Sequence, residues 1–179
     1  MANDLVLYGS GYPDSVKLIH RINRDQLRWN LLGFVDDLDE KQGTSVLGYP
    51  VLGKGDRIPR FDLDSTYFVN NVFSSPANRR LVTEKMSGLG CRFASLVHPE
   101  VNTEFVEIGT DCVIQEGVHF GANVLLGDHT ALRMGAVIGH DCQIGPNVFV
   151  GQGARVAGFV SLFEDLRQPS ILKKDAVHA

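Results

Sequence analysis

The stretch "LRMGAVIGHDCQIGPNVFVGQGARVAG", from Leu132 to Gly158, decides how the second half of this chain folds. An aliphatic residue returns at every sixth position within it, and a glycine follows Ile138, Ile144 and Val150. A period of six matches neither the 3.6 residues of a helical turn nor the two-residue alternation of a strand. It indicates a coil of short strands that bend sharply between repeats.

The same period extends beyond this stretch in both directions. Ten apolar residues stand in phase at six-residue steps: Ile108, Ile114, Phe120, Leu126, Leu132, Ile138, Ile144, Val150, Val156 and Leu162. With three segments to a triangular turn, each of these residues stacks on its copy 18 residues later. The sequence predicts a parallel β-helix over residues 98–163 and an irregular tail over 164–179, where the phase is lost.

Residues 1–97 follow a different pattern, in which short apolar runs alternate with helical periodicity. Strands are predicted over residues 5–8, 31–35, 67–70 and 93–97, and helices from residue 14 and over 78–86. The first helix would align Val16, Ile19, Ile22 and Leu27 along one face. Strands that alternate with helices are typical of a small parallel α/β domain.

Composition and charge narrow the class of protein. A net charge of -4 and a pI near 5.8 argue against a nucleic acid partner. No apolar run approaches the roughly 20 residues of a membrane helix, and residues 1–8 lack signal-peptide features, so we expect a cytoplasmic protein. The three cysteines form no C-x-x-C motif and are expected to be buried thiols, and the histidine spacing predicts no metal site.

Several short motifs occur in a characteristic order along the chain. They are Tyr8-Gly9-Ser10-Gly11, "GFVDD" at 33–37, "VLGYPVLG" at 46–53, "LVHPE" at 96–100 and "GAVIGHDCQIG" at 135–145. In this order they resemble the sugar O-acyltransferase family, which includes sialic acid O-acetyltransferases and bacterial nucleotide-aminosugar N-acetyltransferases. The resemblance covers roughly residues 3–160.

The resemblance implies a fold and an activity. It implies a Rossmann-like nucleotide-sugar-binding domain over residues 1–97 and a left-handed β-helix, whose handedness rests on the resemblance alone. It further implies a homotrimer that binds acetyl-CoA between neighbouring subunits. The expected reaction moves an acetyl group from acetyl-CoA to the amino group of a nucleotide-linked aminosugar for polysaccharide biosynthesis.

The resemblance also assigns roles to residues of the "GAVIGHDCQIG" motif and beyond. His140 would be the general base, since an imidazole with a pKa of about 6.5 accepts a proton at neutral pH. Asp141 would orient its ring and stabilise the imidazolium. The backbone N–H of Gly158 would hold the oxyanion. The alternative is a structural corner histidine, which is how we interpret His119 and His129.

The expected nucleotide-sugar contacts lie mainly in the first half. Gly9 and Gly11 permit a tight turn whose amides face a phosphate, although Asp14 stands where a dinucleotide fingerprint has its third glycine. Asp36 and Asp37 end a predicted strand where acidic side chains contact a ribose or base. A polar strand end in solvent is the alternative interpretation.

Three features depart from the family pattern. Arg133-Met134 replaces a common Asn-Thr pair, so Arg133 is expected to bind a phosphate or carboxylate of the substrate. Phe149 stands where many members have a histidine. The repeats also end early, and Lys173 and Lys174 are expected either in a solvated tail or beside the 3'-phosphate of CoA. These departures keep two alternatives open: O-acetylation of a sialic acid or similar sugar, and a non-catalytic nucleotide-sugar-binding scaffold with a shortened CoA groove.

Overall fold

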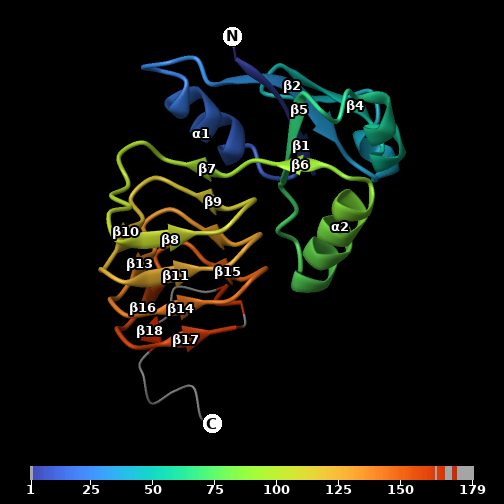
Figure 1. The fold of residues 1–179 in the computed structure, drawn as a ribbon. Helices are drawn as coiled ribbons and strands as arrows, with labels where there is room; N and C mark the ends of the chain where they lie inside the picture. Colours follow the sequence, from blue (N-terminus) through green and yellow to red (C-terminus); the bar gives the residue numbers. More distant parts are fainter. Residues whose placement is uncertain (1, 164, 168–170, 173–179) are drawn as a thin grey trace. The chain divides into compact units, whose positions relative to one another are not determined.

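The computed structural model describes residues 2–163, 165–167 and 171–172 of the 179 residues. The chain divides into two compact units, Met1–Ala94 and Ser95–Ala179 (Figure 1). Among the described residues, no helix has the length and apolar character needed to span a membrane.

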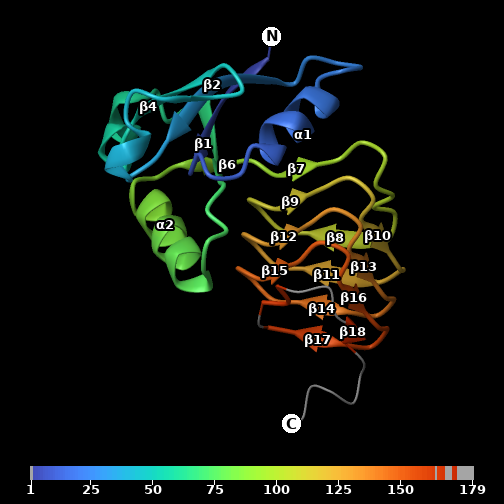
Figure 2. The ribbon, with the colours of Figure 1, turned by 180° about the vertical axis from the view of Figure 1, so that it is seen from behind.

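The N-terminal unit is built on one six-stranded sheet with the strand order β3-β4-β2-β1-β5-β6. Its elements are β1 (Asn3–Tyr8), α1 (Asp14–Ile22), β2 (Trp29–Val35), η1 (Asp39–Lys41), β3 (Ser45–Val46), β4 (Tyr49–Gly53), η2 (Gly55–Arg60), β5 (Thr66–Asn70), α2 (Pro76–Gly88) and β6 (Arg92–Phe93). All pairings are parallel except that of β3 with β4. Helix α1 connects β1 to β2 on one side of β1, whereas α2 connects β5 to β6 on the other side of β1. The right-handed crossover rule therefore puts α1 and α2 on opposite faces of the sheet, as Figures 1 and 2 show.

Two sequence predictions for this unit need correction. Helix α1 ends at Ile22, so Leu27 lies outside it and is 65% exposed. The strand predicted over residues 93–97 is two strands: β6 pairs with β5 in the sheet, whereas β7 (Leu96–Val97) pairs with β9 of the second unit. The mainly apolar run from Phe93 to Val97, interrupted only by Ser95, concealed the change of sheet.

The second unit is a triangular solenoid of three parallel four-stranded sheets. One sheet contains β7, β9 (Val113–Ile114), β12 (Ala131–Leu132) and β15 (Phe149–Val150). Another contains β8 (Val106–Ile108), β11 (Val124–Leu126), β14 (Gln143–Ile144) and β17 (Ser161–Leu162). The third contains β10 (His119–Phe120), β13 (Val137–Ile138), β16 (Arg155–Val156) and β18 (Ile171–Leu172). Figures 1 and 2 show these short strands stacked coil upon coil.

The period of six is confirmed strand by strand. Each of the ten in-phase residues ends one of the strands from β8 to β17. Residues 18 apart pair in the sheets, as in Ile108, Leu126 and Ile144. Most of these residues are buried in a single apolar core, which the hydrophobic effect stabilises by removing one side chain per segment from water. Hexapeptide repeats and parallel sheets of this kind are consistent with a left-handed β-helix.

The corners of the solenoid need backbone with positive φ. One corner uses Gly117, Gly135 and Gly153, with φ between 68° and 72°. The other two corners use residues with side chains, which are Phe105, Asn123, Asp141 and Phe159 on one, and Asp111, His129 and Asn147 on the other. Left-handed backbone is uncommon outside glycine, and asparagine and aspartate tolerate it best. Polar side chains are thereby stacked at two corners, 18 residues apart.

The described part of the tail continues the solenoid, contrary to the irregular tail that we predicted. Leu166 bridges to Val150, and Ile171–Leu172 pairs with Arg155–Val156. Both pairings join residues 16 apart, so this coil is two residues shorter than the 18-residue coils before it. The shorter coil shifts the six-residue phase in the sequence, while the backbone continues to pair. Lys173 and Lys174 lie outside the described residues.

Candidate functional site

His140 and Asp141 form a hydrogen-bonded pair at one corner of the solenoid. The Nδ1 atom of His140 lies 2.7 Å from Oδ2 of Asp141, and the two side chains are 57% and 37% exposed. Hydrogen bonds from His140 and then from Asn123 lower the pKa of the Asp141 carboxyl, so this carboxylate stays ionised at neutral pH. With Nδ1 occupied by the carboxylate, Nε2 is the ring nitrogen left to meet a substrate.

Gly158 lies beneath the imidazole ring, one coil further along the solenoid. A Cβ atom at position 158 would stand 2.9 Å from Nε2 of His140 and 3.1 Å from two ring carbons. The residue one coil before His140 is Ala122, so the equivalent positions in the coils before and after the histidine both have small residues. Phe159 holds the ring from another direction, with centroids 4.8 Å apart and an edge-to-face angle of 85°. The ring is therefore seated in a defined orientation.

A second histidine–aspartate pair occupies another corner, and sequence analysis missed it. Nδ1 of His129 lies 2.9 Å from Oδ2 of Asp111, but these side chains are only 14% and 0% exposed. The sequence offers Asp128 directly before His129, but the carboxylate that contacts the ring is that of Asp111. Asp111 precedes His129 by 18 residues, which is one full coil.

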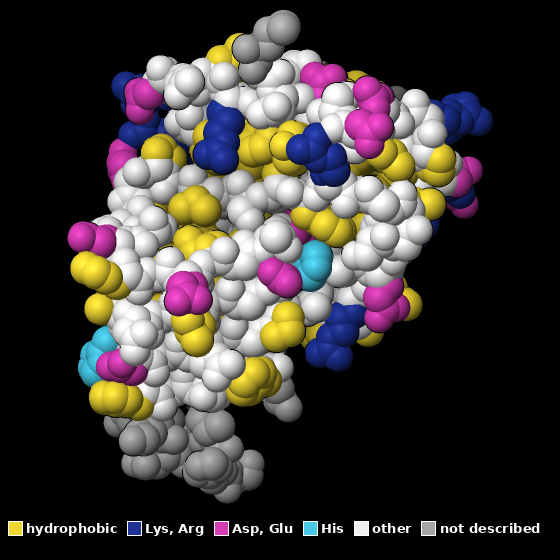
Figure 3. Space-filling view, in the orientation of Figure 1, with side chains coloured by type: hydrophobic (Ala, Val, Ile, Leu, Met, Phe, Trp, Pro, Cys, Tyr) yellow, Lys and Arg dark blue, Asp and Glu magenta, His cyan; other side chains and the backbone are white. Residues whose placement is uncertain are grey.

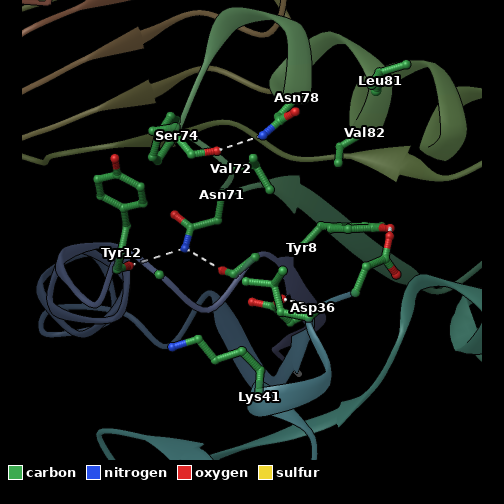
Figure 4. Close-up of a pocket in the computed structure, with 15 residues that line it drawn as sticks. Tyr8, Tyr12, Asp36, Lys41, Asn71, Val72, Ser74, Asn78, Leu81 and Val82 are labelled. Carbon is green, nitrogen blue, oxygen red and sulfur yellow. Dashed lines mark hydrogen bonds between the residues drawn. The ribbon is translucent and has the colours of Figure 1, made fainter.

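A cavity of about 360 Å³ opens in the N-terminal unit at the carboxyl ends of β1, β2 and β5. Because β1 has β2 on one side and β5 on the other, these ends form a topological switch point, where ligands of parallel α/β sheets usually bind. Figure 4 shows Asp36 and Lys41 on one side of the cavity and residues of α2 on the opposite side. The lining includes Gly9, Gly11, Tyr12, Asn71, Phe73, Ser74, Asn78, Leu81 and Val82.

The predicted residues Gly9, Gly11, Asp36 and Asp37 all line this cavity. Gly9 has a φ of 101°, and a Cβ there would stand 2.8 Å from a methyl of Val72, so the turn after β1 requires glycine. Gly11 has open space around its Cα. The turn thus brings backbone to the cavity without side chains in the way.

The two aspartates serve the protein's own structure as well as lining the cavity. Asp36 is buried and accepts hydrogen bonds from the amide and hydroxyl of Ser10 and from the amide of Leu38. This carboxylate ties the turn after β1 to the end of β2. The interpretation of Asp36 as a polar strand end in solvent is therefore wrong.

Asp37 belongs to a cluster with Tyr8 and Lys85. The Tyr8 hydroxyl donates to its Oδ2 at 2.7 Å, the Lys85 ammonium lies 3.0 Å from the same atom, and the Gly55 amide donates to Oδ1 at 2.8 Å. Burial alone would raise the pKa of Asp37, but these hydrogen bonds outweigh it and lower the pKa. Burial, followed by the charge and hydrogen bond of Asp37, raises the pKa of the Tyr8 hydroxyl. Asp37 is therefore ionised at neutral pH and paired with the Lys85 ammonium.

Asn71 is a cavity residue that sequence analysis missed. Its amide donates to the carbonyls of Gly9 and Tyr12 and accepts from the Ser15 hydroxyl, so it holds the whole turn between β1 and α1 (Figure 4). Its signal in the sequence was its place immediately after the predicted strand 67–70. The contact between that strand end and the glycine turn can be predicted only when the strand order, which puts β5 next to β1, is known.

Arg133 and Phe149 are both largely withdrawn from solvent. Arg133 follows β12 and is only 6% exposed. Phe149 is 8% exposed, and the guanidinium of Arg167 lies over its ring. A guanidinium pairs well with anionic groups, and the binding of a substrate phosphate or carboxylate by Arg133 stays a prediction.

The three cysteines are buried free thiols, as predicted. Burial raises the pKa of Cys142, which lies next to the His140–Asp141 pair, and raises that of Cys91 to about 11. Neither is a thiolate at neutral pH, so neither has the reactivity of a nucleophile. Within residues 2–163, 165–167 and 171–172, no group of three potential ligands is arranged to hold a metal ion.

Comparisons with known proteins agree with this architecture. Residues 123–158 match the bacterial transferase hexapeptide model, which consists of six repeats. A histidine-to-asparagine mutant of perosamine N-acetyltransferase from Caulobacter crescentus, solved with CoA and GDP-perosamine, has a TM-score of 0.77 at 23% identity. The similarity covers 90% of this chain and 74% of that one. Among curated protein sequences, none matches this chain.

Two further structures extend the similarity. The acetyltransferase domain of PglB from Neisseria gonorrhoeae FA1090, solved with acetyl coenzyme A, has a TM-score of 0.72 at 19% identity, over 96% of both chains. WeeI from Acinetobacter baumannii AYE has a TM-score of 0.72 at 20% identity, over 88% of this chain and 73% of that one. The chain therefore has the fold of acetyl-CoA-dependent sugar acetyltransferases with hexapeptide repeats.

Proposed function

We propose that this protein transfers an acetyl group from acetyl-CoA to the amino group of a nucleotide-linked aminosugar, with His140 as general base. The observation that carries the proposal is the exposed His140–Asp141 pair, held at a corner with Nε2 directed at Gly158. Solved structures of the same fold include complexes with CoA and GDP-perosamine and with acetyl coenzyme A. Two of them are mutants in which a histidine is replaced.

The proposed reaction needs one proton acceptor and one oxyanion donor. The sugar amine attacks the thioester carbonyl carbon while Nε2 of His140 takes a proton from the amine. Asp141 stabilises the resulting imidazolium, and the backbone N–H of Gly158 hydrogen-bonds the oxyanion of the tetrahedral intermediate. When the C–S bond breaks, the imidazolium returns its proton to the CoA sulfur. The absence of a side chain at Gly158 leaves room for the thioester beside the ring.

The cavity of the N-terminal unit is proposed as a Rossmann-like site for the nucleotide. The amides of Gly9 and Ser10 already donate to the Val35 carbonyl and the Asp36 carboxylate, so the diphosphate is proposed to meet the turn from Gly11 onward, together with the cationic side chain of Lys41. Asp37 suits the N–H groups of a base, because it is ionised and half-exposed. Arg133 is proposed to bind an anionic group of the substrate. As in the family that the sequence resembles, the working assembly would be a homotrimer.

A thiol-release assay tests this function. The protein is incubated with acetyl-CoA and, in turn, with UDP-, dTDP- and GDP-linked 4-aminosugars and with a free sialic acid. We expect thiol release with one nucleotide-linked aminosugar and its loss in His140→Ala. Release with sialic acid alone would replace N-acetylation by O-acetylation. Absence of thiol release with every acceptor, together with no calorimetric binding of acetyl-CoA, would favour the scaffold alternative.

A further inference from the structure

We propose that Asn123 is a positioning residue for His140, which it orients through Asp141. The inference rests on the proposed role of His140 as general base. It adds a residue that lies 18 positions before Asp141 and carries no recognisable motif of its own.

The three side chains form one continuous hydrogen-bonded chain. The Asn123 amide Nδ2–H donates to Oδ1 of Asp141 at 2.6 Å, and Oδ2 of Asp141 lies 2.7 Å from Nδ1 of His140. Asp141 therefore accepts on both oxygens, one from the coil before and one from its own neighbour. The backbone supports the same contact, because the Asp141 amide donates to the carbonyl of Ala122 at 2.9 Å.

Engagement of both oxygens has a chemical consequence for the ring. A carboxylate held by one contact at an exposed corner can rotate about its side-chain bonds and exchange its partner for water. Asp141 is 37% exposed, so without Asn123 its orientation would depend on the histidine alone. With Asn123 in place, the carboxylate stays aligned with Nδ1–H and keeps the lone pair on Nε2. Asn123 thus selects the tautomer that a general base requires.

The corner explains why this position favours asparagine. Asn123 has a φ of 60°, in the left-handed region, as do Asp141 at 54° and Phe159 at 62°. Asparagine tolerates this backbone and also carries an N–H donor. Glycine supplies the backbone without the donor, and aspartate supplies the backbone with an acceptor in place of the donor. Asn123 and Asp141 hold the ring through hydrogen bonds, while Phe159 packs against it.

The test uses two substitutions that keep the backbone preference. Asn123→Gly removes the donor, and Asn123→Asp places a second carboxylate against Asp141. Asn147→Gly is the matched control, because Asn147 has a φ of 58° at a different corner from His140. The measurements are kcat and KM for acetyl-CoA and the accepted aminosugar, and the tautomer of His140 by nitrogen-15 NMR of the free protein.

We expect kcat to fall about 10-fold in Asn123→Gly and about 100-fold in Asn123→Asp, with KM values within about twofold. The NMR spectrum should show Nδ1–H in the wild type and in Asn147→Gly, and a mixture of tautomers in Asn123→Gly. Wild-type kcat and a wild-type tautomer in both Asn123 variants would overturn the inference. If those variants are normal while His140→Ala is inactive, only the role of Asn123 fails. If His140→Ala is also normal, the proposed function fails.

Discussion

His140 and His129 each share a hydrogen bond with an aspartate through Nδ1, at 2.7 and 2.9 Å, and both stand at corners of the same solenoid. Their surroundings differ sharply. The His140–Asp141 pair is 57% and 37% exposed, and its partners are sequence neighbours, whereas the His129–Asp111 pair is 14% and 0% exposed and joins two coils. The same pair of side chains is therefore open to a ligand at one corner and enclosed by the fold at the other.

The difference teaches that a histidine–aspartate contact alone does not define an active site. A pair that joins two coils and is withdrawn from water contributes to stability, because loss of either member removes a hydrogen bond from a buried polar group. A pair at an exposed corner contributes little to stability, because solvent screens it. It keeps one ring nitrogen accessible, which is what acid–base chemistry needs. Substitutions in the two pairs separate these two roles.

The largest expected effect is on turnover in His140→Ala. Loss of the general base should lower kcat by about 100- to 10,000-fold. The free energy of unfolding should stay close to wild type, because the side chain is exposed. The thiol-release assay and urea unfolding measure the two quantities. Activity retained within a factor of ten would remove His140 from the proposed reaction.

The second effect is on stability in His129→Ala. This change leaves the fully buried carboxylate of Asp111 without its histidine, so unfolding should become easier by about 3 kcal/mol. Below the melting temperature of the variant, kcat should remain near that of the wild type. Urea unfolding of both histidine variants makes the comparison direct. A larger loss of unfolding free energy in His140→Ala than in His129→Ala would reverse the assignment of roles.

A third effect concerns the glycine beside the exposed pair. Gly158→Ala puts a methyl group 2.9 Å from Nε2 of His140, so the ring must turn away from Asp141 and kcat should fall about 30-fold. The control is Gly153→Ala, where no atom lies within 4 Å of a Cβ but φ is 68°. That variant should lose about 1 kcal/mol of stability and no activity. Equal kcat values in the two variants would contradict the seating of the ring on Gly158.

The smallest effect is the acid sensitivity of the exposed pair. Hydrogen bonds from His140 and Asn123 lower the pKa of folded Asp141 below its unfolded value. The stabilisation is therefore complete above the unfolded pKa of about 4 and is lost as the pH falls through the folded pKa. Because the pair is exposed, Asp141→Asn should change the unfolding free energy only slightly between pH 7 and pH 3. A steep change in that difference would mean that the exposed pair is a stability element.

Sequence reasoning recovered the solenoid because its signal is local and repeated. One apolar residue every six positions fixes both the strands and their stacking, so residues such as Ile138 and Ile144 were placed correctly. The signal failed at Leu166, where a coil shortened by two residues shifts the phase although the backbone continues to pair. It also failed between Phe93 and Leu96, because an apolar run does not record which sheet receives it.

Of the polar contacts at the solenoid corners, sequence reasoning anticipated only the one between sequence neighbours. His140 and Asp141 stand together, but Asn123 and Asp111 each lie one coil before their partners. The 18-residue coil that the sequence predicts is enough to find both contacts, if polar residues 18 positions apart are compared. Burial is a property of the folded chain, so sequence alone gave no means of telling the exposed pair from the enclosed one.

Sequence reasoning also missed the hairpin of β3 and β4, because its turn has a weak sequence signal. Its turn uses Leu47 and Gly48 with φ values of 51° and 86°, and positive φ at both central residues of a two-residue turn is typical of hairpins. Leucine at the first of these positions is unusual, so the motif "VLGYPVLG" contains no strong turn signal beyond its glycine.

The most direct measurement is a crystal structure of the protein with CoA and the aminosugar nucleotide that it turns over. We predict the acceptor amine within about 3 Å of Nε2 of His140, with the CoA sulfur beside Gly158 and His129 still enclosed with Asp111. An amine bound out of reach of His140, with no ordered water between them, would contradict the proposed chemistry.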